Sequence, residues 1–151
     1  MNETTADISA RKAWMGLMAK APAARVGALL DGACARPDFK WLRPPEVGSV
    51  MVRGRAGGTG APFNLGEMTV TRCALRLASG EVGHAYIQGR SKADAEAAAL
   101  IDALMQTGQA ATLQTAVLDV LAADRAALTK VRAEKAAATK VDFFTMVRGE
   151  D

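Results

Sequence analysis

Apolar residues recur at helical spacing in the first quarter of the chain. Over residues 7–20 they follow a three-then-four spacing that places Trp14 and Met18 on one helical face. A second apolar stripe follows Pro22, a residue that suits the first turn of a helix because its missing N–H is not needed there. The sequence therefore predicts a helical hairpin over about residues 7–35.

Prolines and then a two-residue alternation mark the next segment. Residues 36–47 contain three prolines, each of which removes a backbone donor and biases its predecessor toward extended geometry, so this stretch is predicted to be a connector. From Val50 onward apolar and polar residues alternate, which is typical of a strand. The alternation places the side chains of Arg53 and Arg55 on the same side of that strand.

Two further alternating segments follow a glycine-rich stretch. In residues 68–77 and 82–88 the side chains alternate in polarity with a period of two, and the Ser79-Gly80 pair between them is typical of a turn. They predict an antiparallel hairpin. Together with the preceding strand, this predicts an antiparallel sheet of three or four strands over about residues 47–89.

Helical patterning returns in the last third. Ser91 and Asp94 fit a helix start, because the serine hydroxyl can cap an orphan N–H and the carboxylate suits the positive end of the helix dipole. We expect helices over about residues 91–139, the second part alanine-rich with a thin apolar stripe, and then an apolar tail over residues 140–151. Segregated helices and strands make the predicted fold class α+β.

Composition limits the possible functions. The chain has 151 residues, 50% hydrophobic and 23% charged, which fits one globular domain over residues 1–151. The net charge is only +3, aromatic residues are 5%, and basic residues are spread along the chain, so nucleic-acid binding is not expected. Two distant cysteines and one histidine cannot form a structural zinc site. No apolar run reaches the roughly 18 residues of a membrane span, and a cytoplasmic protein is expected.

The first candidate for chemistry is the segment RGRAGGTGAPFNLGE, residues 53–67. Its glycines could let backbone N–H groups converge on an anion that two arginines neutralise. Alternatively, the glycines only solve steric problems in a wide connection between strands. The segment lacks the Gly-Lys-Ser/Thr of a nucleotide-binding P-loop. The candidate phosphate-binding residues are Arg53, Arg55, Gly57, Gly58, Thr59 and Gly60.

A second candidate is His84, the only histidine, which shares a strand face with Tyr86. As a general base it would need an orienting carboxylate and a substrate proton within about 3 Å, and a structural role is the alternative. No motif of a self-sufficient hydrolase, metalloprotease or redox enzyme is present.

The apolar tail is the third candidate. It either closes the protein's own core or docks on a partner. The candidate partner-interface residues are Val141, Phe143, Phe144, Met146, Val147 and Arg148.

Several segments, in the expected order over nearly the whole chain, resemble the G subunit family of the bacterial carbon-phosphorus lyase core complex. They are RKAWM at 11–15, RGRAGGTGAPFNLGEMTVTRCALRL at 53–77, GHAYIQGR at 83–90, AEAAALIDALMQ at 95–106 and KVDFFTMVRGE at 140–150. Where that family usually has an aspartate and a histidine, this chain has Ser91 and Asp94.

The resemblance implies a subunit of a complex that displaces adenine from ATP with a phosphonate, giving a ribose 1-phosphonate 5-triphosphate. It implies no cofactor bound by this subunit alone and no catalytic residue transferred by motif. The implied partners are the other core subunits, chiefly the larger nucleosidase-type subunit, with two copies of this chain in a symmetric hetero-oligomer.

Overall fold

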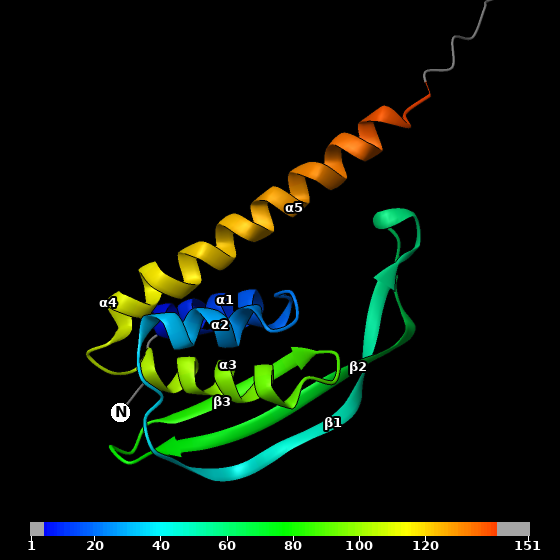
Figure 1. Cartoon of the computed structure of the whole chain (residues 1–151). Coiled ribbons are helices and arrows are strands. Elements are labelled where there is room, and N and C mark those ends of the chain that lie inside the picture. The colour runs from blue at the N-terminus through cyan, green and yellow to red at the C-terminus, as the bar shows by residue number, and fades with distance from the viewer. Residues whose placement is uncertain (1–4, 142–151) are drawn as a thin grey trace, which may run out of the picture.

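The computed structural model describes residues 5–141, with side chains from residue 7 onward. In these residues two helices precede three strands, and further helices follow (Figure 1). The elements are α1 (Thr5–Ala19), α2 (Arg25–Ala33), β1 (Phe39–Arg55), η1 (Ala56–Gly58), β2 (Pro62–Leu77), β3 (Val82–Gln88), α3 (Lys92–Leu104), α4 (Ala110–Leu113), η2 (Gln114–Leu118) and α5 (Asp119–Ala138). The α+β class, the helical hairpin and the C-terminal helices are confirmed.

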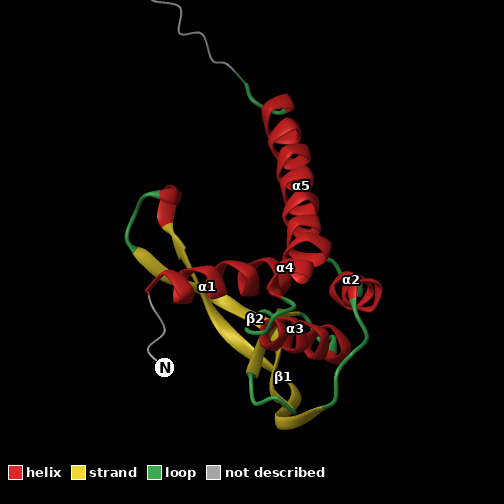
Figure 2. Ribbon diagram, turned by 90° about the vertical axis from the view of Figure 1, so that its left-hand side faces the viewer, coloured by secondary structure: helices red, strands yellow, loops and turns green. Residues whose placement is uncertain are grey.

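The sheet of the described residues has three antiparallel strands in the order β1, β2, β3. Helices α1, α2 and α3 lie on one of its faces, and no described helix covers the other (Figures 1 and 2). In β2, alternate residues from Thr71 to Leu77 are buried toward the helices, as the alternation predicted. The opposite, outward face of the sheet carries Arg72 and Arg76.

Helix α3 packs closely on β3 because the contacting residues are small. A Cβ on Gly83 would lie 1.9 Å from the carbonyl oxygen of Ala99 and 2.9 Å from the Cβ of Ala103, so only glycine permits this approach. At the start of α3 the Ser91 hydroxyl accepts the Asp94 N–H at 3.1 Å, which confirms the predicted cap.

The core lies between the sheet and the helices. It combines large aliphatic side chains from α1, α2 and β2 with a run of buried alanines on α3, a composition that brings the layers close together. The largest fully buried apolar side chains are Met18, Val26, Leu30, Leu75, Leu100, Ile101, Leu113, Val117 and Leu118.

The prediction of a connector over residues 36–47 was wrong, because β1 already begins at Phe39. The strand passes through Pro44 and Pro45 with register shifts on both sides of Arg43. Since β1 is an edge strand, it can accommodate prolines at bulges without leaving a partner strand unpaired. Phe39 packs edge-to-face on Trp41, with ring centroids 4.8 Å apart, and anchors the early part of the strand on the core.

The alanine-rich segment forms α4, one π turn (η2) and the long α5. Its apolar stripe is divided: Val117 and Leu121 are buried in the core, whereas Leu128 and Val131 are about half exposed. Helix α5 therefore docks by its first turn and then projects away from the body (Figure 1).

Candidate functional site

The paired ends of β1 and β2 extend beyond the helices as a two-stranded arm (Figures 1 and 2). We define the arm as residues 50–55 and 62–67 with the tip at residues 56–61. The predicted wide glycine-rich loop is thus much shorter than expected, because the strands run to Arg55 and resume at Pro62. The glycine-rich segment is therefore mainly a projecting hairpin.

The glycines at the tip serve a tight reversal of the chain. Gly57 and Gly58 have φ of 60° and 81°, the left-handed region that side chains rarely adopt. A Cβ on Gly60 would lie 2.7 Å from the carbonyl oxygen of Ala56, which accepts the Gly60 N–H at 2.9 Å. These steric requirements account for the glycines without a ligand.

The two candidate arginines of the arm differ in what their side chains contact. The Arg55 guanidinium donates to the Gly60 carbonyl at 3.0 Å and so braces the tip. Arg53 is exposed and pairs across the hairpin with Asn64. The structure thus brings Arg55 onto the glycine-rich turn, together with Thr59, and leaves the Arg53 head group at the surface of the arm.

The arm also exposes large apolar side chains. Phe63 is 45% exposed and Leu65 is 65% exposed. Both lie beside Gly54, where a Cβ would be 3.6 Å from the Phe63 ring and 3.7 Å from the Leu65 Cβ. Met51, on the facing strand, is also about half exposed. An apolar group of this kind on a projecting hairpin is typical of a protein contact.

The outward sheet face beside the arm carries a charged cluster. Arg43 and Arg72 both contact the Glu46 carboxylate, at 2.6 and 2.7 Å, and Arg72 also donates to the Tyr86 hydroxyl at 3.3 Å. The hydrogen bond from Arg72 lowers the pKa of Glu46, and the bonds to Tyr86 and Glu46 raise the pKa of Arg72. Cationic and anionic groups here hold one another in their charged forms.

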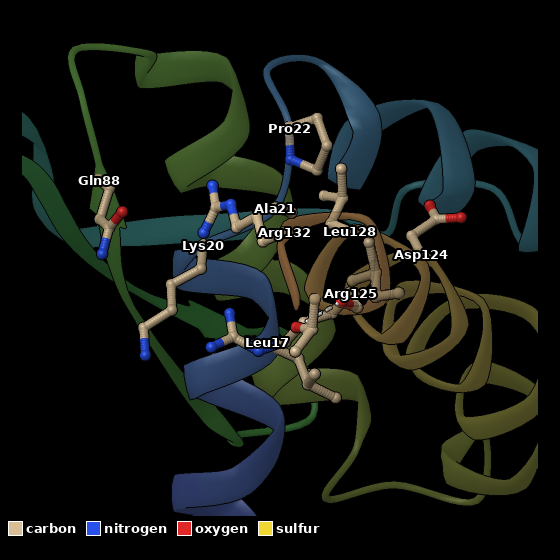
Figure 3. A pocket seen from close by; sticks show the side chains of 11 residues that line it. Leu17, Lys20, Ala21, Pro22, Gln88, Asp124, Arg125, Leu128 and Arg132 are labelled. Atoms are coloured by element: carbon tan, nitrogen blue, oxygen red, sulfur yellow. Dashed lines mark hydrogen bonds between the residues drawn. The ribbon is translucent and has the colours of Figure 1, made fainter. Parts of the chain in front are cut away.

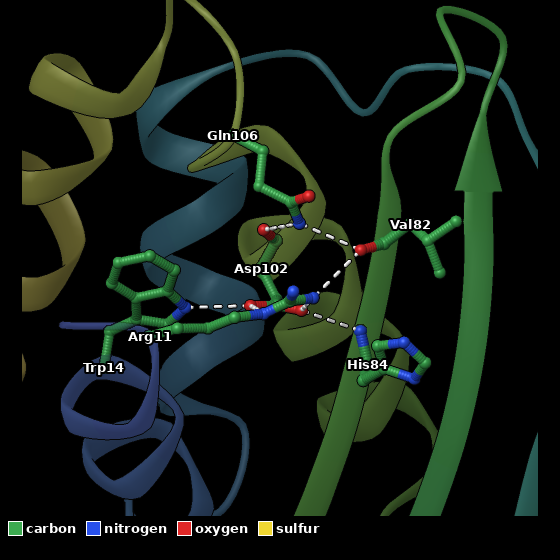
Figure 4. Close-up of polar contacts among 6 residues, drawn as sticks. All are labelled: Arg11, Trp14, Val82, His84, Asp102 and Gln106. Carbon is green, nitrogen blue, oxygen red and sulfur yellow. Dashed lines mark hydrogen bonds and ion pairs between the residues drawn. The ribbon is translucent and has the colours of Figure 1, made fainter. Parts of the chain in front are cut away.

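His84 lies on this outward face opposite Ala74, and its side chain is exposed. The carboxylate of Asp102, on α3, lies on the other side of the strand and accepts the backbone N–H of His84 at 2.8 Å (Figure 4). Asp102 therefore does not orient the imidazole as a catalytic carboxylate would. The contact favours the structural alternative for this segment.

Asp102 is the centre of a buried polar network that sequence analysis missed (Figure 4). Its carboxylate is fully buried and accepts bonds from Arg11 Nε at 3.1 Å, Arg11 Nη2 at 2.7 Å and Trp14 Nε1 at 2.9 Å. Arg11 also donates to the Val82 carbonyl at 3.1 Å. The sequence does contain a hint of this network: Asp102 stands alone within an apolar helical run, and a buried carboxylate needs hydrogen-bond donors. Arg11 and Trp14, three residues apart on one helical face, are such donors.

The two cysteines do not form part of a catalytic or metal site within the described residues. Burial raises the pKa of the Cys73 thiol to about 12, and its Sγ donates to the Ala95 carbonyl at 3.2 Å. Burial also raises the pKa of Cys34, which favours the thiol form. Residues 5–141 contain no cluster of three or more histidine, cysteine, aspartate or glutamate side chains able to hold a metal ion. In the same part of the chain no helix is long and apolar enough to cross a bilayer.

Most of the predicted tail interface lies outside the described residues, namely Phe143, Phe144, Met146, Val147 and Arg148. Val141, the one candidate within them, is 67% exposed and follows the end of α5.

Comparison with known proteins places these features in a family. Residues 9–149 match the model of the family described as phosphonate metabolism protein PhnG. A protein of Rhizobium meliloti (strain 1021), named alpha-D-ribose 1-methylphosphonate 5-triphosphate synthase subunit PhnG, is 45% identical over 146 residues. The matched region covers 97% of this chain and 94% of that protein.

Proposed function

The chain belongs to the PhnG family of phosphonate metabolism proteins, and from this premise we propose that it is a subunit of alpha-D-ribose 1-methylphosphonate 5-triphosphate synthase. In that role it supports a reaction in which a phosphonate displaces adenine from ATP. ATP and the phosphonate are then substrates of the whole complex. The nearly full-length match to a relative that bears this name is the observation that carries the proposal.

Within the complex we assign this chain an assembling role rather than a catalytic one. Its fully buried carboxylate, Asp102, is engaged by Arg11, Trp14 and a backbone N–H, and the pKa shift of Cys73 keeps that thiol protonated. A catalytic group needs access to substrate and a protonation state matched to its task. The larger nucleosidase-type subunit is the proposed seat of the chemistry.

The arm is the proposed docking element. Phe63 and Leu65 are 45% and 65% exposed on a two-stranded support, and burial of the remaining surface would stabilise an interface by roughly 1–2 kcal/mol for each side chain. No residue of the arm is buried, so this hairpin adds little to the core of the isolated chain. We propose that the arm packs against the larger subunit, with two copies of this chain in a symmetric cytoplasmic assembly.

Co-expression with the companion subunits tests this docking role. The double variant Phe63→Ser plus Leu65→Ser should fold with an unchanged unfolding midpoint, since both side chains are exposed, and should co-purify with its partners at a strongly reduced yield. Ile8→Ser plus Val131→Ser removes two exposed apolar side chains elsewhere and serves as the matched control. Full recovery of the complex with the arm variant would contradict the docking role.

A second function for the arm rests on Arg53 and the glycine-rich tip. The tip could bring Arg53 and Arg55 to the triphosphate or phosphonate in a shared active site. Calorimetric titration of ATP into the assembled complex tests this idea with Arg53→Ala plus Arg55→Ala. We expect weaker ATP binding if the tip contacts the ligand. An unchanged affinity would show that the tip serves assembly alone.

A further inference from the structure

We propose that a hollow between the end of α1 and the exposed half of α5 binds a short polyphosphate chain. The hollow has a volume of about 310 Å³ and is formed by α1, the turn that follows it, the end of β3 and α5 (Figure 3). It lies apart from the arm and its tip. The inference does not depend on the proposed assembly role, because it rests only on groups of this chain.

Three cationic side chains line this hollow, Lys20 from the end of α1 and Arg125 and Arg132 from α5. Figure 3 shows their head groups extending to the side of the hollow where the Gln88 carboxamide lies. None of the three cations has a side-chain hydrogen bond or an ion pair within residues 5–141. Their charges are therefore not neutralised by the surrounding fold.

The only acidic side chain that lines the hollow is already engaged. Asp124 accepts a bond from Arg25 Nε at 2.9 Å, in an ion pair that joins α5 to α2. Thr129 donates its hydroxyl to the Arg125 carbonyl at 2.9 Å. The groups that remain for a ligand are thus positive or neutral donors, which selects an anion.

The spacing of the cations indicates the length of that anion. Arg125 and Arg132 are seven residues apart, two helical turns, so their Cα atoms are separated by about 10 Å along α5. A chain of two or three phosphates can contact both guanidinium groups while the side chains stay extended, whereas a single phosphate group can do so only if both side chains bend toward each other. Guanidinium groups also bind phosphate oxygens in a bidentate manner, and Lys20 adds a third charge at the α1 side.

Calorimetric titration of the full chain with tripolyphosphate at near-physiological salt is the direct test. We expect saturable binding to the native chain and a loss of about tenfold or more in affinity for Arg125→Gln plus Arg132→Gln, as removal of charged hydrogen bonds predicts. The matched control is Lys130→Gln plus Lys135→Gln. It removes the same charge from the same helix at positions that do not line the hollow.

Three outcomes would overturn the proposal. They are no saturable binding to the native chain, an equal loss of affinity in the control, and an unchanged affinity in the arginine variant. An equal loss would mean that the anion responds only to the overall field of the helix. A parallel series with phosphate, pyrophosphate and tripolyphosphate should show affinity rising with chain length, and equal affinities would contradict a two-arginine site.

The same variants separate this inference from the assembly role. Arg125→Gln plus Arg132→Gln should co-purify with the partner subunits as well as the native chain does. The arm variant Phe63→Ser plus Leu65→Ser should in turn keep its affinity for tripolyphosphate. ATP added as a fourth ligand distinguishes a nucleotide source of the polyphosphate from an inorganic one, because only a nucleotide site would bind ATP more tightly than tripolyphosphate.

Discussion

Asp102 joins three elements through one side chain. It lies on α3 and accepts bonds from Arg11 and Trp14 of α1 and from the backbone of β3 at His84. The described residues contain no buried side-chain nitrogen or oxygen without a partner. A charge that is buried and fully satisfied in this way stabilises one arrangement of the elements over others.

Asp102→Asn is therefore expected to lower the free energy of unfolding by about 3–5 kcal/mol, because the amide cannot neutralise Arg11 and presents an N–H toward other donors. Urea denaturation followed by circular dichroism measures the change. Asp119→Asn, an exposed position at the start of α5, is the control and should change stability by less than about 0.5 kcal/mol. A similar small change for both variants would contradict the role assigned to Asp102.

Cys73 predicts a pH dependence of stability. Its pKa is raised from 9.0 to about 12 in the folded chain, so folding favours the protonated thiol. The stabilisation is complete below the unfolded pKa of 9 and is lost as the pH rises toward 12, with a slope of about 1.4 kcal/mol per pH unit. The difference in unfolding free energy between the native chain and Cys73→Ala should hence shrink between pH 9 and 11. A constant difference would contradict the shift.

Single residues show where sequence reasoning succeeds and where it fails. Ser91 was identified as a cap because the pattern is local: its hydroxyl accepts a hydrogen bond from the N–H of Asp94, only three residues later. Asp102 was not identified, because its partners are 88 and 91 residues away in the sequence. Local patterns carry no information about which distant donors a buried carboxylate will meet.

At the scale of elements, strand β1 shows the same limit in another form. Its second half was predicted from alternation, but its first half, from Phe39, was hidden by prolines that propensity alone assigns to a connector. The bulges on either side of Arg43 depend on pairing with β2, which only the tertiary structure reveals. The tip was likewise shorter than predicted, because cross-strand pairing extends to Arg55 and Pro62.

The second half of helix α5 is expected to be less stable than the other helices. Beyond Leu121 it has no buried apolar side chain among the described residues, so over residues 122–138 its stability rests on alanine propensity, on the Arg25–Asp124 ion pair with α2 and on local pairs such as Lys130 with Glu134. We expect the backbone amides of residues 126–138 to exchange hydrogen much faster than those of α3 in the isolated chain. Native-state hydrogen exchange with mass spectrometry measures both, and equal protection would contradict this view.

At the scale of the whole molecule, the described residues bury a core that ends well before the C-terminal tail. The last buried apolar residue of the described part is Leu121, and Val141 is exposed. Truncation after Lys140 is thus expected to leave the free energy of unfolding within about 0.5 kcal/mol and to reduce co-purification with the partner subunits. A large loss of stability would instead assign the tail to the protein's own core. Retained assembly would count against docking by the tail.

The prolines of β1 have a further consequence for a subunit that is made before it meets its partners. Pro44 and Pro45 have no backbone N–H, so at this point of the free edge β1 offers no donor to a strand from another chain. Another chain cannot then extend its own strand along this edge without losing a hydrogen bond. The prolines thereby disfavour pairing with another chain along this part of β1, while the arm stays exposed.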